Sequence, residues 1–210
     1  MLFVVKEKWH KWLPYLFMLI AAVSRWPGLF PPNFSVFYAL SFCAGAFFPG
    51  LMAWWLPLGT MAVTDVVLNV FFYHQPVVSW YMLIKAASFA GLVLLGRMFS
   101  PRSSWFKLLF GGLLGAVLFY VITNTASWLY NPEYPKTFAG WIQALTIGTS
   151  GWPETWKFFR NTLISGGLFT GFFAGALKLT EASESAKEKE SNEAPVEEPQ
   201  PEAEPAAEEI

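Results

Sequence analysis

The apolar stretch from Leu56 to His74 (LPLGTMAVTDVVLNVFFYH) constrains this chain more than any other feature. It is long enough to cross a bilayer as a helix, yet it contains Asp65 and Asn69. A carboxylate near the bilayer centre costs roughly 3 kcal/mol or more unless it meets a partner or a wet cavity, which makes Asp65 a candidate functional residue. Asp65 and Asn69 are four residues apart and therefore share one helix face. The alternative is that the pair only holds neighbouring helices together.

The rest of the chain predicts an all-α integral membrane protein. Hydrophobic residues make up 54% of the chain and charged residues only 14%. Its apolar runs predict a domain of six transmembrane helices over residues 1–180, with spans at about 4–24, 36–48, 54–74, 77–96, 108–128 and 158–179. Because the first run is short and follows several lysines, a cleaved signal peptide is the alternative there. Residues 181–210 contain eleven Glu and no aromatic residue, which predicts a disordered acidic tail.

The longest connection between predicted spans, residues 130–157, contains the apolar stretch from Phe138 to Ile147. This stretch is too short to cross a bilayer, so it predicts a short helix in or near the outer interface. Such a helix is placed to act as a lid over a pocket formed by polar helix ends. An inert surface helix, anchored by nearby tryptophans, is an equally good interpretation.

A second buried charge, Lys85, lies in the fourth predicted span. If the chain turns near residue 75, Asp65 and Lys85 each lie about ten residues, or roughly 15 Å, from the same surface. An ion pair between them is therefore geometrically feasible, and a paired charge is far cheaper to bury than two separate ones. The two alternatives are that Asp65 faces a ligand and that Lys85 extends to the interface.

Two further patterns concern the fifth and sixth spans. Asn124 lies in the polar end TNTASW of the fifth span, where its amide needs hydrogen-bond partners. In the sixth span, Gly167, Gly171 and Gly175 recur every four residues, a spacing that brings helix backbones together. We expect this stripe to pack within the molecule rather than form a dimer seam.

The distribution of Lys and Arg predicts the orientation. Most of them outside the tail fall on the side of the two termini, which the positive-inside rule assigns to the cytoplasm. The unusual polar features then collect on the outer side, where a pocket would open outward to a small solute. We therefore expect a solute-binding or transport subunit. The alternative is a membrane assembly protein whose acidic tail recruits a basic cytoplasmic partner.

Other functions find little support in the sequence. No histidine lies near a candidate nucleophile and no two carboxylates are paired, so an enzyme is not expected. The single cysteine and two histidines form no metal-ligand spacing. We expect no cofactor, no metal and no nucleic-acid partner, and the bilayer is the one partner that composition itself implies.

Several runs carry a resemblance, among them PNFSVFYALSFCAGAFF (32–48), LPLGTMAVTD (56–65), TNTASW (123–128), YPKTFAGW (134–141) and FFRNTLISGG (158–167). The chain resembles a family of uncharacterised bacterial six-helix membrane proteins. That family is in turn distantly similar to the substrate-binding S components of energy-coupling-factor (ECF) vitamin transporters. The resemblance implies a multi-pass protein of the bacterial cytoplasmic membrane that binds a vitamin-like solute from outside, with ATP-driven coupling subunits as partners.

The candidate solute-binding residues combine both lines of reasoning. Asp65, Asn69, Lys85 and Asn124 come from the patterns above, and the resemblance implies Asp65 and Asn124 together with Asn33, Trp128, Tyr134, Lys136 and Asn161. The chain also departs from S components. Phe17, Ala21 and Arg25 occupy the register of the Ala-xxx-Ala pattern that docks the coupling subunit, which weighs against coupling to an ATPase. Related sequences carry an acidic residue near Gly166 and Gly167, so a less charged site is expected here.

Overall fold

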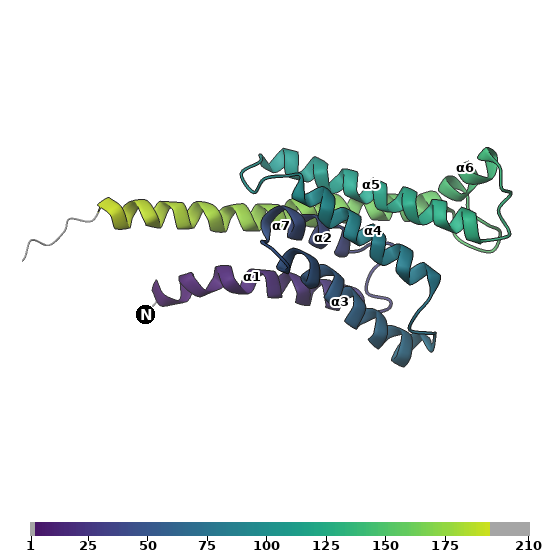
Figure 1. Cartoon of the computed structure of the whole chain (residues 1–210), viewed down its shortest axis with the longest axis horizontal. Coiled ribbons are helices and arrows are strands. Elements are labelled where there is room, and N and C mark those ends of the chain that lie inside the picture. The colour runs from purple at the N-terminus through teal and green to yellow at the C-terminus, as the bar shows by residue number, and fades with distance from the viewer. Residues whose placement is uncertain (1–2, 194–210) are drawn as a thin grey trace, which may run out of the picture.

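The computed structural model describes residues 3–193, and this part of the chain forms helices and loops without a β-strand (Figure 1). The prediction of an all-helical protein is confirmed. In chain order the helices are α1 (Phe3–Ser24), α2 (Phe37–Phe47), α3 (Met52–Leu68), the π-helical turn η1 (Asn69–Tyr73), α4 (Trp80–Arg97), α5 (Trp105–Tyr130), α6 (Phe138–Thr146) and α7 (Thr155–Glu193).

The helix boundaries follow local sequence signals. Ser79, Ser104 and Thr137 precede α4, α5 and α6, and the side chain of each accepts a hydrogen bond from a backbone N–H three residues later. These bonds satisfy N–H groups that the first helical turn leaves without partners. Gly50 and His74 adopt left-handed backbone conformations, with φ of 53° and 52°, in the turns after α2 and η1. The first turn therefore contains a glycine, Gly50, and the second lies two residues before a proline, Pro76.

The central helix is α2, which packs against α3, α4, α5 and α7. Its close contact with α4 depends on two glycines, Gly45 and Gly96. A Cβ on Gly45 would lie 2.1 Å from the carbonyl oxygen of Val93, and one on Gly96 would lie 2.1 Å from that of Phe42. Because real Cβ atoms do not approach backbone oxygens so closely, any side chain at either position would separate the two helices.

The predicted glycine stripe of the last span lies along α5. A Cβ on Gly167 would come within 3.1 Å of Leu113, and Trp105 lies next to both Gly171 and Gly175. The indole N–H of Trp105 donates a 3.0 Å hydrogen bond to the carbonyl oxygen of Gly171. The stripe thus faces a helix of the same chain.

Within the described residues, four helical segments are long and apolar enough to cross a membrane: Met52–Tyr73, Trp80–Arg97, Trp105–Tyr130 and Thr155–Ser183. The apolar parts of the first two helices, Trp12–Ser24 and Phe37–Phe47, are shorter. Large apolar side chains such as Phe71 and Phe110 are exposed on the outer surfaces of the long segments. An all-helical body with several long apolar helices and apolar outer faces is that of a membrane-embedded protein.

The last helix continues beyond its predicted end. The sequence predicted that the sixth span stops near residue 179 and that a disordered tail begins at 181, whereas α7 is helical to Glu193. Residues 181–193 contain no Pro or Gly and consist largely of Ala, Glu and Lys, which favour helix. They extend a helix that is already nucleated, so the prediction of disorder is wrong for this segment. The remainder of the predicted tail, 194–210, lies outside the described residues.

The start of α1 and the end of α7 lie at the same end of the molecule (Figure 1). The loop between α4 and α5 lies toward this end as well, whereas α6 and the turn between η1 and α4 lie at the other. Helix α1 ends at Ser24 and α2 is short, and the loop between them turns back before reaching the end that carries α6 (Figure 1). Charged and polar residues at the start of this loop therefore lie beside the middle of the longer helices.

Candidate functional site

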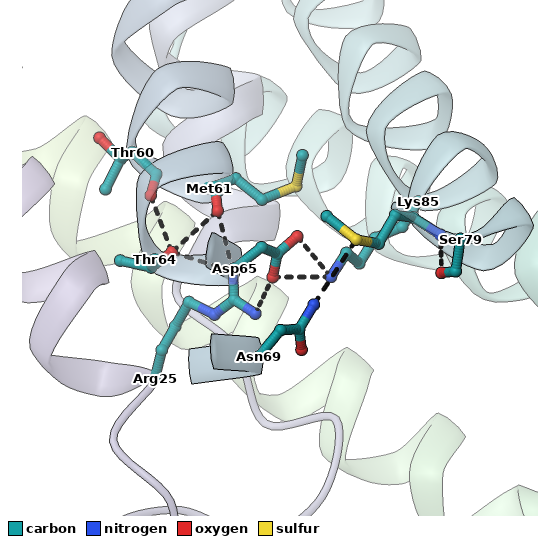
Figure 2. Close-up of polar contacts among 9 residues, drawn as sticks. Arg25, Thr60, Met61, Thr64, Asp65, Asn69, Ser79 and Lys85 are labelled. Atoms are coloured by element: carbon teal, nitrogen blue, oxygen red, sulfur yellow. Dashed lines mark hydrogen bonds and ion pairs between the residues drawn. The ribbon is translucent and has the colours of Figure 1, made fainter. Parts of the chain in front are cut away.

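The carboxylate of Asp65 lies in the interior, with 3% of its side chain exposed. Lys85 reaches it from α4, and its ammonium nitrogen lies 2.9 Å from Oδ1 and 2.8 Å from Oδ2 (Figure 2). The two side chains are thus in direct contact. This contact agrees with the prediction that they lie equally far from the turn between their helices. With 18% of its side chain exposed, Lys85 points inward rather than to the interface.

A second cation completes the cluster and was missed in the sequence. Arg25 follows the end of α1, and its Nη2 donates to Oδ1 of Asp65. Its Nη1 donates to the hydroxyl of Thr64 at 3.0 Å and to the carbonyl oxygen of Met61 at 3.4 Å (Figure 2). The guanidinium also lies over the ring of Phe37, 5.6 Å from its centroid. We call Arg25, Asp65 and Lys85 the Asp65 cluster.

The Asp65 cluster contains two cations and one carboxylate. An arginine stays protonated in proteins, so with Lys85 charged the cluster carries a net charge of about +1. In a buried setting, an excess charge without a counter-ion is costly. The cluster therefore has the electrostatics of a site that attracts an anion.

A cavity of about 550 Å³ lies beside this cluster. Arg25 and Lys85 belong to its wall, whereas Asp65 lies behind them. Most of the wall is the loop from residue 24 to 35, together with side chains from α2, α3, η1, α4 and α5. Aromatic residues contribute much of the surface: Trp26, Phe30, Phe34, Phe37, Tyr38, Tyr73, Tyr81, Phe89 and Phe119. This volume is typical of a pocket for a small organic ligand.

Residues 6–189 match the model of DUF6580, a family of unknown function. The chain belongs to this family. No curated protein and no solved structure matches it. The matched segment contains the whole of the Asp65 cluster and all of the residues that line the cavity, so both are features of the DUF6580 part of the chain.

The loop over the cavity of this DUF6580 protein is held in place by α7 and α2. Asn161 of α7 donates from Nδ2 to the carbonyl oxygen of Pro32 at 2.9 Å. The carbonyl oxygen of the next residue, Asn33, accepts a 3.2 Å hydrogen bond from Tyr38. Asn33 has φ of 59°, a left-handed conformation that asparagine tolerates better than most residues. Of these predicted site residues, Asn33 lines the cavity and Asn161 fixes the loop that covers it.

Asn69 lies at the edge of the Asp65 cluster and does not line the cavity. Its Nδ2 lies 3.6 Å from the sulfur of Met82 (Figure 2). Its backbone carbonyl oxygen accepts a hydrogen bond from the backbone N–H of Gln75. It begins the π-helical turn η1, a type of helix distortion that is frequent at functional sites. The last residue of this turn, Tyr73, does line the cavity.

The other predicted site residues form a separate corner, where α6 packs on α5. Asn124 donates to the carbonyl oxygen of Tyr120 one turn earlier, at 2.8 Å. Trp128 donates to the carbonyl oxygen of Pro135, and Lys136 donates to those of Trp128 and Asn131. None of these residues lines the cavity. Trp128 and Lys136 thus satisfy carbonyl groups at and after the end of α5, and Asn124 bonds back to a carbonyl within the helix.

The structure also corrects the prediction that α6 is a lid over the pocket. No residue of α6 lines the cavity, which the loop of residues 24–35 covers instead. Trp141 of α6 donates to the hydroxyl of Thr125 at 2.9 Å, and Tyr120 donates to the carbonyl oxygen of Leu145 at 2.8 Å. These bonds hold α6 against α5. The length of the apolar stretch predicted a short helix but not the helix on which it packs.

Two titratable groups near this corner have shifted pKa values. Burial raises the pKa of the Tyr134 phenol, which therefore stays neutral at physiological pH. The ammonium of Lys157, 3.0 Å away, holds the pKa of the exposed Glu154 carboxyl below its usual value. Within the described residues, no group of three or more His, Cys, Asp or Glu is arranged to hold a metal ion.

Arg25 was missed because the sequence linked it only to the docking register of Phe17 and Ala21 and not to Asp65. One signal was present: it is the first charge after an apolar run, whereas Asp65 and Lys85 already implied a charged layer at mid-depth. The aromatic wall gave no comparable signal, since aromatic residues at helical spacing are usually core residues.

Proposed function

We propose that this DUF6580 protein is a small-solute binding or transport subunit of the bacterial cytoplasmic membrane, similar in role to the S component of an ECF transporter. The observation that carries the proposal is the 550 Å³ cavity with two charged side chains in its wall. A cavity serving only as packing would be apolar and small, because buried polar groups are costly. A cavity whose wall carries charge and many aromatic rings suits a polar organic molecule.

The proposal includes six membrane crossings with both termini in the cytoplasm. Four long apolar segments are joined by the shorter apolar segments Trp12–Ser24 of α1 and Phe37–Phe47 of α2, which pack against the same bundle. The loop between α4 and α5 lies toward the end of the molecule that holds the two termini (Figure 1). Arg97 ends α4, Arg102 lies in this loop and Lys178 donates to the loop carbonyl of Pro101, which agrees with the positive-inside rule. In this orientation the cavity opens toward the outer side.

The proposal is tested by a thermal-shift screen of the full chain in detergent, against vitamins, their precursors and amino acids. A ligand that binds only the folded state stabilises it by about 2.7 kcal/mol at a hundredfold excess over its Kd. We expect at least one solute to raise the Tm. Failure of the whole panel would overturn the proposal and favour the assembly function of the acidic tail.

A matched pair of variants locates the site. Trp26 lines the cavity and is 68% exposed, whereas Trp152 is 75% exposed in the loop before α7 and does not line it. Both are loop tryptophans, so replacement by alanine should affect folding similarly. We expect Trp26→Ala to reduce the ligand-induced shift and Trp152→Ala to leave it unchanged. Equal effects would place the binding site elsewhere.

A further inference from the structure

The geometry points to the chemical class of the solute: a small organic monoanion, a carboxylate on an aromatic body, whose charged group pairs with Lys85 and Arg25. This inference rests on the proposed solute-binding function and adds the charge of the ligand. It starts from the order in which the charges of the Asp65 cluster face the cavity. Both cations belong to the cavity wall, whereas Asp65 does not. A solute in the cavity therefore meets positive charge first.

The two cations have hydrogen-bond donors to spare. An ammonium has three N–H groups, and within the described residues the partner of Lys85 is Asp65 alone. A guanidinium has five, of which Arg25 uses three for Met61, Thr64 and Asp65. Donors of this kind form short, strong hydrogen bonds with a carboxylate. A ligand carboxylate would thus accept hydrogen bonds from N–H groups of Lys85 and Arg25 that have no acceptor among the described residues.

The charge balance argues for one negative charge on the ligand. With the net charge of the cluster at about +1, a monoanion brings the buried site to neutrality. A cationic ligand would face two like charges with the one carboxylate behind them, which is electrostatically unfavourable. A neutral ligand would leave the excess charge uncompensated.

The body of the ligand is inferred from the remaining wall. Phe37, Phe89 and Phe119 come from three different helices, and Tyr81 adds a ring with a hydroxyl group. Rings from several directions favour a flat apolar group, because aromatic pairs stabilise by offset stacking or edge contacts. The cavity wall thus combines two cations that suit a carboxylate with aromatic rings that suit the body of the ligand.

The inference is tested with charge-matched probes. Indole-3-acetate, indole-3-acetamide and tryptamine share one ring system and differ in charge, and benzoate, benzamide and benzylamine form a second such series. Binding of each to the full chain is measured by calorimetry in detergent at constant ionic strength. We expect the acids to bind at least about tenfold more tightly than the amides, the ratio that a charge-assisted hydrogen bond supplies. Amines should not bind.

Variants of the Asp65 cluster separate charge from shape. Lys85→Met leaves the neutral pair of Arg25 and Asp65 beside the cavity, so we expect it to weaken the binding of the acids far more than that of the amides and to abolish the preference for the acids. The double variant Asp65→Asn, Lys85→Met restores a net charge of about +1 and should recover part of the preference. Lys107→Met, at an exposed position near the start of α5, is the control and should change neither.

The outcomes distinguish this inference from the proposed function. If an amide or an amine binds as tightly as its acid, and Trp26→Ala weakens that binding, the solute site stands and the anion inference is overturned. If acids bind but Lys85→Met does not alter their preference over the amides, the anion inference is overturned as well. If no probe of any charge binds and the solute screen also fails, both proposals fall.

Discussion

Lys85 and Asp65 are twenty residues apart in the chain, and their charged groups meet at 2.8–2.9 Å between two neighbouring helices. The spacing places them at equal depth on either side of the turn that joins η1 to α4. Arg25, forty residues before Asp65, reaches the same carboxylate from the end of α1. The carboxylate therefore joins α1, α3 and α4 at one point.

Removing the carboxylate should be the most damaging single change in the cluster. Asp65→Asn leaves two partly buried cations without a counter-ion, and we expect it to lower the free energy of unfolding by about 3 kcal/mol. Lys85→Met should cost less, because the pair of Arg25 and Asp65 remains. The measurement is denaturation of the purified protein in detergent, with Glu133→Gln, in an exposed loop, as the control.

The same two changes should not be additive. In the double variant Asp65→Asn, Lys85→Met, only one cation remains without a partner, so the loss of stability should be smaller than the sum of the two single losses. We expect a coupling energy of about 1–3 kcal/mol, as for residues of one ion-pair network. Additive losses would show that Lys85 and Asp65 do not stabilise each other.

The contact between α2 and α4 should depend on Gly96. Gly96→Ala would place a Cβ 2.1 Å from the carbonyl oxygen of Phe42, so we expect a loss of about 1–3 kcal/mol from overpacking. Gly91, on the same helix, has no atom within 4 Å of its Cβ position and is the matched control. Gly91→Ala should leave the stability unchanged or raise it by up to about 1 kcal/mol. Equal Tm values for the two variants would contradict the close approach.

Lys136 should matter for stability and not for ligand binding. Its ammonium donates to the carbonyl oxygens of Trp128 and Asn131 at the end of α5, and Lys136 does not line the cavity. Lys136→Met should lower the free energy of unfolding by about 1 kcal/mol. Its Kd for the solute found in the screen should equal that of the wild type. A larger Kd at unchanged stability would instead show that Lys136 belongs to the solute site, as the sequence predicted.

The proposed orientation predicts which loops are accessible from outside. Cys43 is the single cysteine and is fully buried, so Cys43→Ala provides a background for labelling. In intact cells, a membrane-impermeant maleimide should label Ser150→Cys, in the loop before α7. It should not label Ser103→Cys, in the loop between α4 and α5, until the membrane is permeabilised. The reverse pattern would invert the topology, and labelling of both would contradict the number of crossings.

The sequence by itself determined the features that depend on neighbouring residues. Apolar runs, prolines, glycines and capping residues such as Ser79 and Ser104 set the course of the helices, because helix formation and termination are local events. It also indicated the contact between Asp65 and Lys85, since two antiparallel helices joined by a short turn have related depths. The prediction of disorder was wrong at residues 181–193 because it rested on composition. Composition showed that this segment has too few apolar residues to form a core, but it did not take into account the preference of these residues for helix.

Only the tertiary structure decided which polar residues share a site. Asn33 and Lys85 line one cavity, whereas Asn124 and Lys136 hydrogen-bond to backbone carbonyls at a different corner, although all four were candidates for one site. The position of Arg25 depends on the packing of α1 against α3, which no local pattern encodes. A net charge at the cavity wall is a sum over three elements, so it exists only once those elements are assembled.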